Sequence, residues 1–88
     1  MFEYDPDKSV ANFAKHGIDF EMAQMLWSDD RRIELETRYF SEDRLIIVGM
    51  IETKHWAVVI TLREAIIRII SARRARISEA RAYDSQKN

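Results

Sequence analysis

Arginines cluster near the end of this sequence, and their spacing indicates a site that binds an anion. Arg68 stands among isoleucines in an apolar segment, and Arg73, Arg74 and Arg76 follow within a few residues. A guanidinium among apolar side chains needs a carboxylate, a carbonyl or a ligand phosphate in place of water. Three arginines this close repel one another unless an anion lies among them. We expect a phosphate-binding site here; the alternative for Arg68 is a structural ion pair with a glutamate of the sheet.

Two further side chains could transfer protons. His16 belongs to the segment Lys15-His16-Gly17, where it either takes part in acid–base chemistry beside the arginines or serves as a helix-end or core histidine. Tyr83 either presents its hydroxyl or packs in the core. His55 is expected at the surface.

Several classes of chemistry are excluded by composition. There is no cysteine, no glycine-rich phosphate loop, no GxSxG segment and no zinc-binding spacing. What remains is acid–base and electrostatic catalysis by Arg, Lys, His and Tyr on a phosphodiester. RNA cleavage suits these residues because the 2′-hydroxyl is the nucleophile, so we expect neither a metal nor a cofactor. The composition permits this chemistry without requiring it.

Charge is unevenly distributed along the chain. Residues 1–30 contain two basic and seven acidic side chains, whereas residues 63–88 contain seven basic and three acidic ones, although the net charge is only −1. Arginine outnumbers lysine ten to four, which favours forked contacts with phosphate. The local field of the last third therefore favours an anionic partner, the alternative being an ordinary solvated face.

The elements that would position these residues begin with a short strand, Phe2–Tyr4, and two helices. Asp5 followed by proline predicts the start of a helix over residues 6–16, and Gly17 predicts its end. Asp19 predicts a second helix, which carries Phe20, Ala23 and Trp27 at helical spacing.

From Arg31 the hydrophobic period changes from about 3.6 residues to 2. Ile33, Leu35, Thr37 and Tyr39 alternate with charged residues, as in a half-exposed strand. Further strands are predicted over Arg44–Ile51, Lys54–Leu62 and Ile66–Ala72, and a last helix over Arg76–Asp84. The short breaks between them, Ser41–Asp43, Glu52–Thr53 and Arg63–Ala65, favour an antiparallel meander. The fold class is therefore α+β, with an antiparallel four-stranded sheet, N-terminal helices and a C-terminal helix.

Alternation along the last predicted strand places its arginines on opposite faces. Arg68 would share one face with Ile66 and Ile70, and Arg73 would share the other with Ile67, Ile69 and Ser71.

The chain is also expected to be cytoplasmic and to make no membrane contact. Its longest strongly apolar run, Leu45–Ile51, is far shorter than a membrane span, and its first residues are acidic where a signal peptide would be basic.

Several segments together resemble the BrnT family of toxins from bacterial two-component toxin–antitoxin modules. The opening block is Phe2-Glu3-Tyr4-Asp5-Pro6-Asp7-Lys8, with Asn12 and Lys15-His16-Gly17-Ile18 after it. Glu42-Asp43-Arg44 and Ile47-Val48-Gly49 are similar to the second block, and Thr61-Leu62-Arg63, Arg68-Ile69-Ile70-Ser71-Ala72-Arg73, Glu79 and Tyr83 are similar to the closing block. The resemblance spans nearly the whole chain, so residues 1–88 are expected to form one BrnT-like toxin domain.

This resemblance implies a RelE-like α+β fold and a metal-independent endoribonuclease that blocks translation. It also implies a cognate antitoxin, which supplies all DNA binding in a repressor complex, and a heterotetramer of two toxins and two antitoxins. By matching positions, the catalytic residues would be Lys15, His16, Arg63, Arg73 and Tyr83, and the RNA phosphates would be bound by Arg68, Arg74 and Arg76. The arginines would clamp anions, His16 or Tyr83 would transfer protons, and Lys15 would offset charge at the cleaved phosphate. Met22, Met25, Leu26 and Trp27 are expected in the core, with an antitoxin interface as the alternative.

Three positions depart from the family's pattern. Glu64 stands where the family usually has glycine, Met50 where arginine is common, and Ala80 where the closing helix often has arginine. These changes reduce positive charge. The alternative function is therefore a catalytically degenerate module that acts only as a protein partner in an autoregulatory repressor complex.

Overall fold

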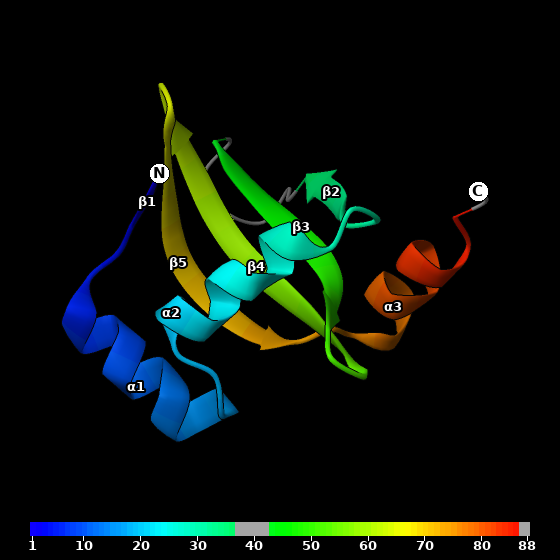
Figure 1. Cartoon of the computed structure of the whole chain (residues 1–88), viewed down its shortest axis with the longest axis horizontal. Coiled ribbons are helices and arrows are strands. Elements are labelled where there is room, and N and C mark those ends of the chain that lie inside the picture. Colours follow the sequence, from blue (N-terminus) through cyan, green and yellow to red (C-terminus); the bar gives the residue numbers. More distant parts are fainter. Residues whose placement is uncertain (37–42, 87–88) are drawn as a thin grey trace.

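One five-stranded sheet organises the chain, with helices packed against it (Figure 1). The computed structural model describes residues 1–36 and 43–86. In chain order its elements are β1 (Phe2–Glu3), α1 (Pro6–His16), α2 (Phe20–Ala23), the 3-10 helix η1 (Gln24–Ser28), β2 (Ile33–Glu36), β3 (Arg44–Ile51), β4 (Lys54–Arg63), β5 (Ile66–Arg74) and α3 (Ile77–Asp84). The α+β class is confirmed. The expected alternation at Thr37 and Tyr39 and most of the break Ser41–Asp43 lie outside the described residues.

The predicted four-stranded antiparallel sheet is wrong in one respect. The strand order is β1–β5–β4–β3–β2, in which β2 to β5 form the expected meander and β1 adds a fifth, parallel strand. Phe2 pairs with Ile67, and Glu3 with Arg68. A two-residue strand is too short to show which strand it joins, and its partner lies more than sixty residues away. The RelE-like arrangement stays a prediction.

Helix boundaries follow the predicted capping residues. Asp5 Oδ1 accepts hydrogen bonds from the backbone N–H groups of Asp7 (2.9 Å) and Lys8 (3.4 Å). Gly17 has a φ of 76° and donates its N–H to the Phe13 carbonyl, an arrangement that glycine adopts without strain. Asp19 caps α2 through the N–H of Met22. The second helix tightens to 3-10 geometry after Ala23.

A β-bulge in β5 overturns the predicted placement of its arginines. Ser71 pairs with Val59 and Ile69 pairs with Ile60, so Ile70 is one extra residue on β5. The extra residue reverses the alternation, and Arg68 and Arg73 consequently lie on the same face of the sheet. The prediction of opposite faces is wrong because strict alternation cannot reveal an inserted residue.

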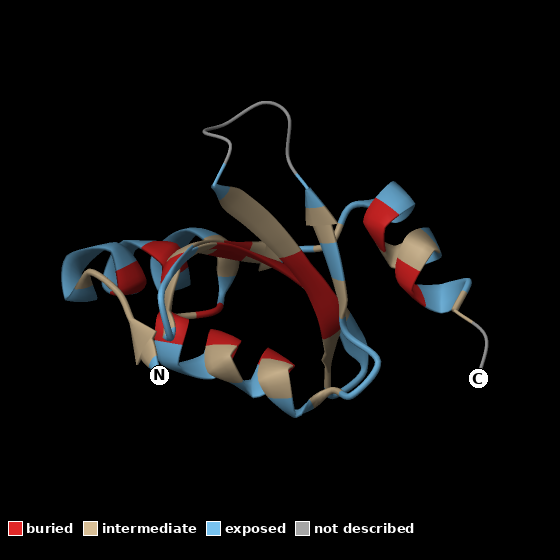
Figure 2. Cartoon of the chain, turned by 90° about the horizontal axis from the view of Figure 1, so that it is seen from above, coloured by how far each residue is buried: buried red, intermediate tan, exposed pale blue. Residues whose placement is uncertain are grey.

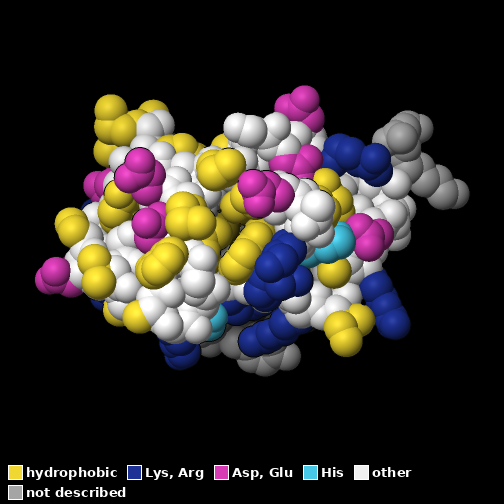
Figure 3. Space-filling model, turned by 60° about the horizontal axis from the view of Figure 1, so that its bottom comes forward, with side chains coloured by type: hydrophobic (Ala, Val, Ile, Leu, Met, Phe, Trp, Pro, Cys, Tyr) yellow, Lys and Arg dark blue, Asp and Glu magenta, His cyan; other side chains and the backbone are white. Residues whose placement is uncertain are grey.

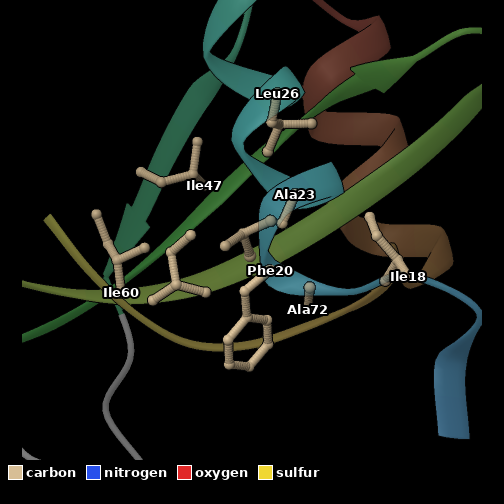
Figure 4. Packing of buried hydrophobic residues seen from close by; sticks show 9 residues of the cluster. Ile18, Phe20, Ala23, Leu26, Ile47, Ile60 and Ala72 are labelled. Atoms are coloured by element: carbon tan, nitrogen blue, oxygen red, sulfur yellow. The ribbon is translucent and has the colours of Figure 1, made fainter. Parts of the chain in front are cut away.

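The opposite face of the sheet is buried by α1, α2 and η1; we call it the covered face. Its buried strand residues contact the apolar side chains of α2 and η1 around Phe20 and Leu26 (Figure 4). These strand residues are Ile47, Val58, Ile60, Ile69 and Ala72. Figure 2 shows the buried residues running along the central strands and on the sides of helices that face the sheet. This core fixes α1 beside β5 and α2 across the sheet.

Asn12 replaces a neighbouring strand where β1 ends. Its side-chain amide donates to the Ala72 carbonyl (2.8 Å) and accepts from the Ala72 N–H (3.3 Å). It also donates to the Ile18 carbonyl (2.8 Å), so one buried side chain holds α1, the following loop and the edge of β5 together.

The residues expected in the core after Asp19 divide into two pairs. Leu26 is buried and Trp27 is half-buried against the core, as predicted. Met22 and Met25 are exposed, so the prediction is wrong for them. The short α2–η1 segment turns only one side to the sheet.

None of the helices formed by residues 1–36 and 43–86 is long and apolar enough to cross a membrane.

Candidate functional site

The second face of the sheet carries most of the predicted arginines; we call it the arginine face. Cross-strand pairs define it, because directly paired residues project to the same side. One row runs through Arg44, Thr61, Arg68 and Glu3 from β3 to β1. Three further pairs of β4 and β5 residues belong to the arginine face: Arg63 with Ile66, Val59 with Ser71, and Ala57 with Arg73. The predicted residues Arg63, Arg68 and Arg73 are thus brought together on one surface, whose far end is packed under α3.

Arg68 is held by an ion pair that remains in contact with solvent. Its Nη1 donates to Glu3 Oε2 at 3.1 Å, and the two side chains are 34% and 36% exposed. This is the structural ion pair with a glutamate of the sheet, the alternative for Arg68. Such half-exposed pairs contribute little to stability, and a phosphate can compete with this carboxylate for the guanidinium.

Arg73 makes a more buried, two-pronged ion pair with Glu79 at the start of α3. Its two terminal nitrogens donate to the two carboxylate oxygens at 2.8 Å and 2.9 Å. The hydrogen bonds to Glu79 raise the pKa of Arg73, although burial opposes the increase. Burial would raise the pKa of Glu79, but hydrogen bonds from Arg73 and from the Arg76 N–H lower it overall. The anion beside this arginine is therefore the chain's own carboxylate.

Arg74 lies on the other side of the sheet, and Arg76 lies beyond the end of β5. Arg74 is exposed, its guanidinium lies 5.5 Å from the ring centre of Trp56, and its Nε donates to the His55 carbonyl at 3.3 Å. Trp56 packs against the core of the covered face, so Arg74 lies on that side of β5. Arg76 is an exposed residue at the N-terminus of α3. Of the three residues predicted to bind RNA phosphates, only Arg68 lies on the arginine face.

Tyr83 packs in the core, and its hydroxyl is held by a partner inside the chain. Its ring packs with Val48 and Ala57 on the arginine face, and its hydroxyl donates to Asp29 Oδ2 at 2.6 Å. Burial, followed by the contact with Asp29, raises the pKa of Tyr83 to about 12. Burial acts to raise the pKa of Asp29, but hydrogen bonds from Tyr83, Met50 and Arg31 lower it overall. Tyr83 therefore keeps its proton at neutral pH.

Lys15 and His16 form the last turn of α1, away from Tyr83. Lys15 is exposed and His16 half-buried. His16 lies one turn beyond Asn12, on the side of α1 that faces β5 and α2. Tyr83 instead packs over β3 and β4. The two candidate proton-transfer groups therefore belong to different sides of the site.

The sequence analysis missed a contact between His55 and the last helix. His55 Nε2 lies 2.8 Å from Asp84 Oδ1, and the His55 ring meets the Tyr83 ring edge-on at 5.4 Å. His55 is half-buried rather than a simple surface residue. Only the tertiary structure reveals this contact, because the two residues are 29 positions apart in the sequence. Glu79, by contrast, is an acidic residue in the first turn of a helix, a signal that the sequence does carry.

Comparison with protein families places the chain in the class of ribonuclease toxins from type II toxin–antitoxin systems. The family model of the ribonuclease toxin BrnT matches residues 4–79, which is most of the chain. The chain therefore belongs to the BrnT family. None of the curated proteins matches its sequence.

The departures from the family's pattern have clear places in the structure. Glu64 has a φ of 54° in the β4–β5 hairpin, a left-handed conformation that suits the family's usual glycine better than glutamate. Met50 packs, half-buried, in the cluster around Tyr83, and Ala80 lies half-buried on α3. A glycine at position 64 would adopt this backbone conformation without strain.

Proposed function

We propose that this chain cleaves RNA on the arginine face and thereby inhibits translation in the cytoplasm until a cognate antitoxin neutralises it. The proposal rests on family membership and on one observation. The bulge at Ile70 brings Arg68 and Arg73 to the face that also carries Arg63, opposite the face covered by the N-terminal helices. Arginines gathered on one surface suit a polyanionic backbone.

The chemistry follows from RNA's own nucleophile. A base removes the proton of the 2′-hydroxyl, whose oxygen attacks the adjacent phosphorus while the bond to the 5′-oxygen breaks. An acid then protonates the leaving 5′-oxygen, which leaves a 2′,3′-cyclic phosphate. Since no metal enters these steps, electrostatic stabilisation of the phosphorane is assigned to arginines and lysine.

We assign phosphate binding and proton transfer to side chains according to whether each already has a partner within the described residues. Arg63 is exposed and, within residues 1–36 and 43–86, has no ion-pair partner; with Arg68 it would bind the phosphates. His16 would transfer protons from the end of α1, near the Ala72 end of β5, and Lys15 would offset charge beside it. The RNA would therefore have to cross the outer edge of β5 to reach both these residues and Arg68. Tyr83 would have to release Asp29 before it could act, so we favour His16.

The test is cleavage of RNA by the purified chain, free of antitoxin and in the presence of EDTA. We expect the parent to cleave and the double variant Arg63→Ala/Arg68→Gln to lose at least about tenfold in rate. Lys54→Ala removes an exposed cation from the covered-face side of β4 and serves as the matched control, with no expected loss. Intact RNA with the folded parent would contradict the proposal.

One observation favours the alternative function, a catalytically inactive partner in an autoregulatory repressor complex. Arg73 and Tyr83 are already engaged by Glu79 and Asp29 inside the chain. In that case the antitoxin, which supplies the DNA binding, would still form a complex with the chain, for example a heterotetramer with two copies of each protein. Expression of the soluble chain alone would then cause no growth arrest.

A further inference from the structure

An apolar surface on the N-terminal helices has no partner within the described parts of the chain. It consists of Val10 and Phe13 on α1 and Met22 and Met25 on α2 and η1, all exposed; we call it the α1–α2 patch. Figure 3 shows hydrophobic side chains gathered over this half of the molecule with acidic side chains among them, while arginines and lysines gather on the other half.

Helix geometry places the two halves of the patch side by side. On α1, Asn12 faces β5, and Ser9 faces α2 because its hydroxyl accepts a hydrogen bond from the Phe20 N–H. Successive residues advance by about 100°, so Phe13 and Val10 follow Ser9 on the α2 side of the helix.

The lysines of α1 lie away from the patch. Lys8 and Lys15 both lie on one side of Asn12 around the helix, and Phe13 and Val10 lie on the other. On the neighbouring segment Met22 and Met25 are three residues apart, and Glu21 is four residues before Met25, so all three share its outward side. The charged residues closest to the patch are consequently acidic.

We propose that the α1–α2 patch is the docking surface for the antitoxin, through an amphipathic segment whose apolar side chains are flanked by lysine or arginine. This inference rests on the proposed function, since it supplies the protein partner. The first 30 residues contain seven acidic and two basic side chains and no arginine, so this surface repels RNA and attracts a cationic segment. A second copy of the chain would set like charges against each other across a two-fold axis.

The docking surface and the arginine face lie on opposite sides of the sheet. The antitoxin segment can therefore seat on the α1–α2 patch without displacing either ion pair of β5. Variants of the patch should lose the antitoxin while they retain activity on RNA, which separates this inference from the proposed ribonuclease.

The experiment compares two double variants in binding to the antitoxin encoded beside this chain. Phe13→Ser/Met25→Ser alters two patch residues that are each 52% exposed, and Leu62→Ser/Ile77→Ser alters apolar residues elsewhere that are 51% and 73% exposed. Because all four side chains are exposed, both variants should fold, which thermal unfolding checks. We expect the dissociation constant of the patch variant to rise at least about tenfold and that of the control to stay within about twofold.

Reversing one charge tests antitoxin binding a second way, without removing an apolar side chain. Glu21→Lys should weaken binding several-fold, with a loss that shrinks as salt rises, whereas Glu34→Lys on β2 should leave binding unchanged. Unchanged affinity in both patch variants would overturn the inference. The inference would also be overturned if the parent chain forms a dimer and the patch variant is a monomer, because a second copy of the chain would then occupy the patch.

RNA cleavage by the same proteins distinguishes the two proposals. If the patch controls antitoxin binding but the parent leaves RNA intact, the ribonuclease proposal fails and the docking surface stands. If the parent cleaves RNA but does not bind the antitoxin, the docking surface fails alone.

Discussion

The two ends of the arginine face use the same pair of residue types in different ways. At the hairpin end, Arg68 meets Glu3 through one 3.1 Å contact between side chains that are about one-third exposed. At the helix end, Arg73 meets Glu79 through two contacts of 2.8 Å and 2.9 Å, and the Glu79 side chain is only 8% exposed. A two-pronged, buried pair ties α3 to the sheet, whereas a single, solvated contact can exchange its partner. The hairpin end is therefore the part of the face suited to bind substrate, and the helix end is structural.

The strongest test of this difference removes the carboxylate at the helix end. Glu79→Gln leaves Arg73 charged and largely shielded from water, so we expect a loss of about 2–3 kcal/mol in the free energy of unfolding. Urea unfolding measures it. The double variant Arg73→Gln/Glu79→Gln should recover part of the loss, and a change below about 0.5 kcal/mol in the single variant would remove the structural role.

Low pH should destabilise the helix end of the arginine face. The pKa of Glu79 is lower in the folded chain than its ordinary value of 4.5, so its contribution is present above pH 4.5 and is lost as pH falls through the folded value. Asp29, whose pKa is also lowered, adds a contribution of the same sign. In the parent, stability should decline more steeply below pH 4.5 than in Glu79→Gln. Parallel pH profiles would contradict this assignment.

Tyr83→Phe tests the second contact that holds α3. Removing the hydroxyl deprives Asp29 of a donor and should destabilise the fold by about 1–2 kcal/mol. Because the folded pKa of Tyr83 is raised from 10.0 to about 12, its contribution is complete below pH 10 and is lost as pH rises through about 12. The parent should therefore lose more stability than the variant between pH 10 and pH 12, as thermal unfolding can show.

The hairpin end should respond in RNA affinity more than in stability. Arg68→Gln and Glu3→Gln should each change the unfolding free energy by less than about 1 kcal/mol. Arg68→Gln should weaken RNA binding and reduce the slope of the logarithm of the binding constant against the logarithm of the salt concentration by about 1, because one phosphate contact is lost. Glu3→Gln should instead strengthen RNA binding, because it removes a carboxylate that competes with phosphate for Arg68. Weaker binding by Glu3→Gln would show that this pair positions Arg68 instead of competing with RNA.

The smallest effect is expected in the turn beside Arg63. Glu64→Gly relieves a left-handed backbone conformation and should raise stability by about 0.5 kcal/mol, since the greater freedom of the unfolded glycine offsets part of the gain. Glu52→Gly, in the other hairpin with a φ of 56°, is the matched comparison for stability. Only the change at Glu64 also removes a negative charge beside Arg63, so only that variant should bind RNA more tightly.

Local order was determined by the sequence itself. Asp5 with Pro6, Gly17 and Asp19 set the boundaries of the N-terminal helices, because caps and left-handed glycines act through hydrogen bonds to near neighbours. The change of hydrophobic period at Arg31 likewise predicted the start of the strands, and the short breaks between the strands predicted the meander. The arginines on β5 were readable as a candidate anion site for the same reason: their crowding is visible along the chain.

Tertiary structure alone decided which of these arginines act together and which are already paired. One extra residue at Ile70 moved Arg68 and Arg73 to a common face, and no sequence pattern marks a single bulge. Glu3, Asp29 and Asp84 became partners of Arg68, Tyr83 and His55 across separations of 65, 54 and 29 residues. Such contacts form only when the packed sheet and helices bring distant segments together, because hydrogen bonds and ion pairs depend on position in space.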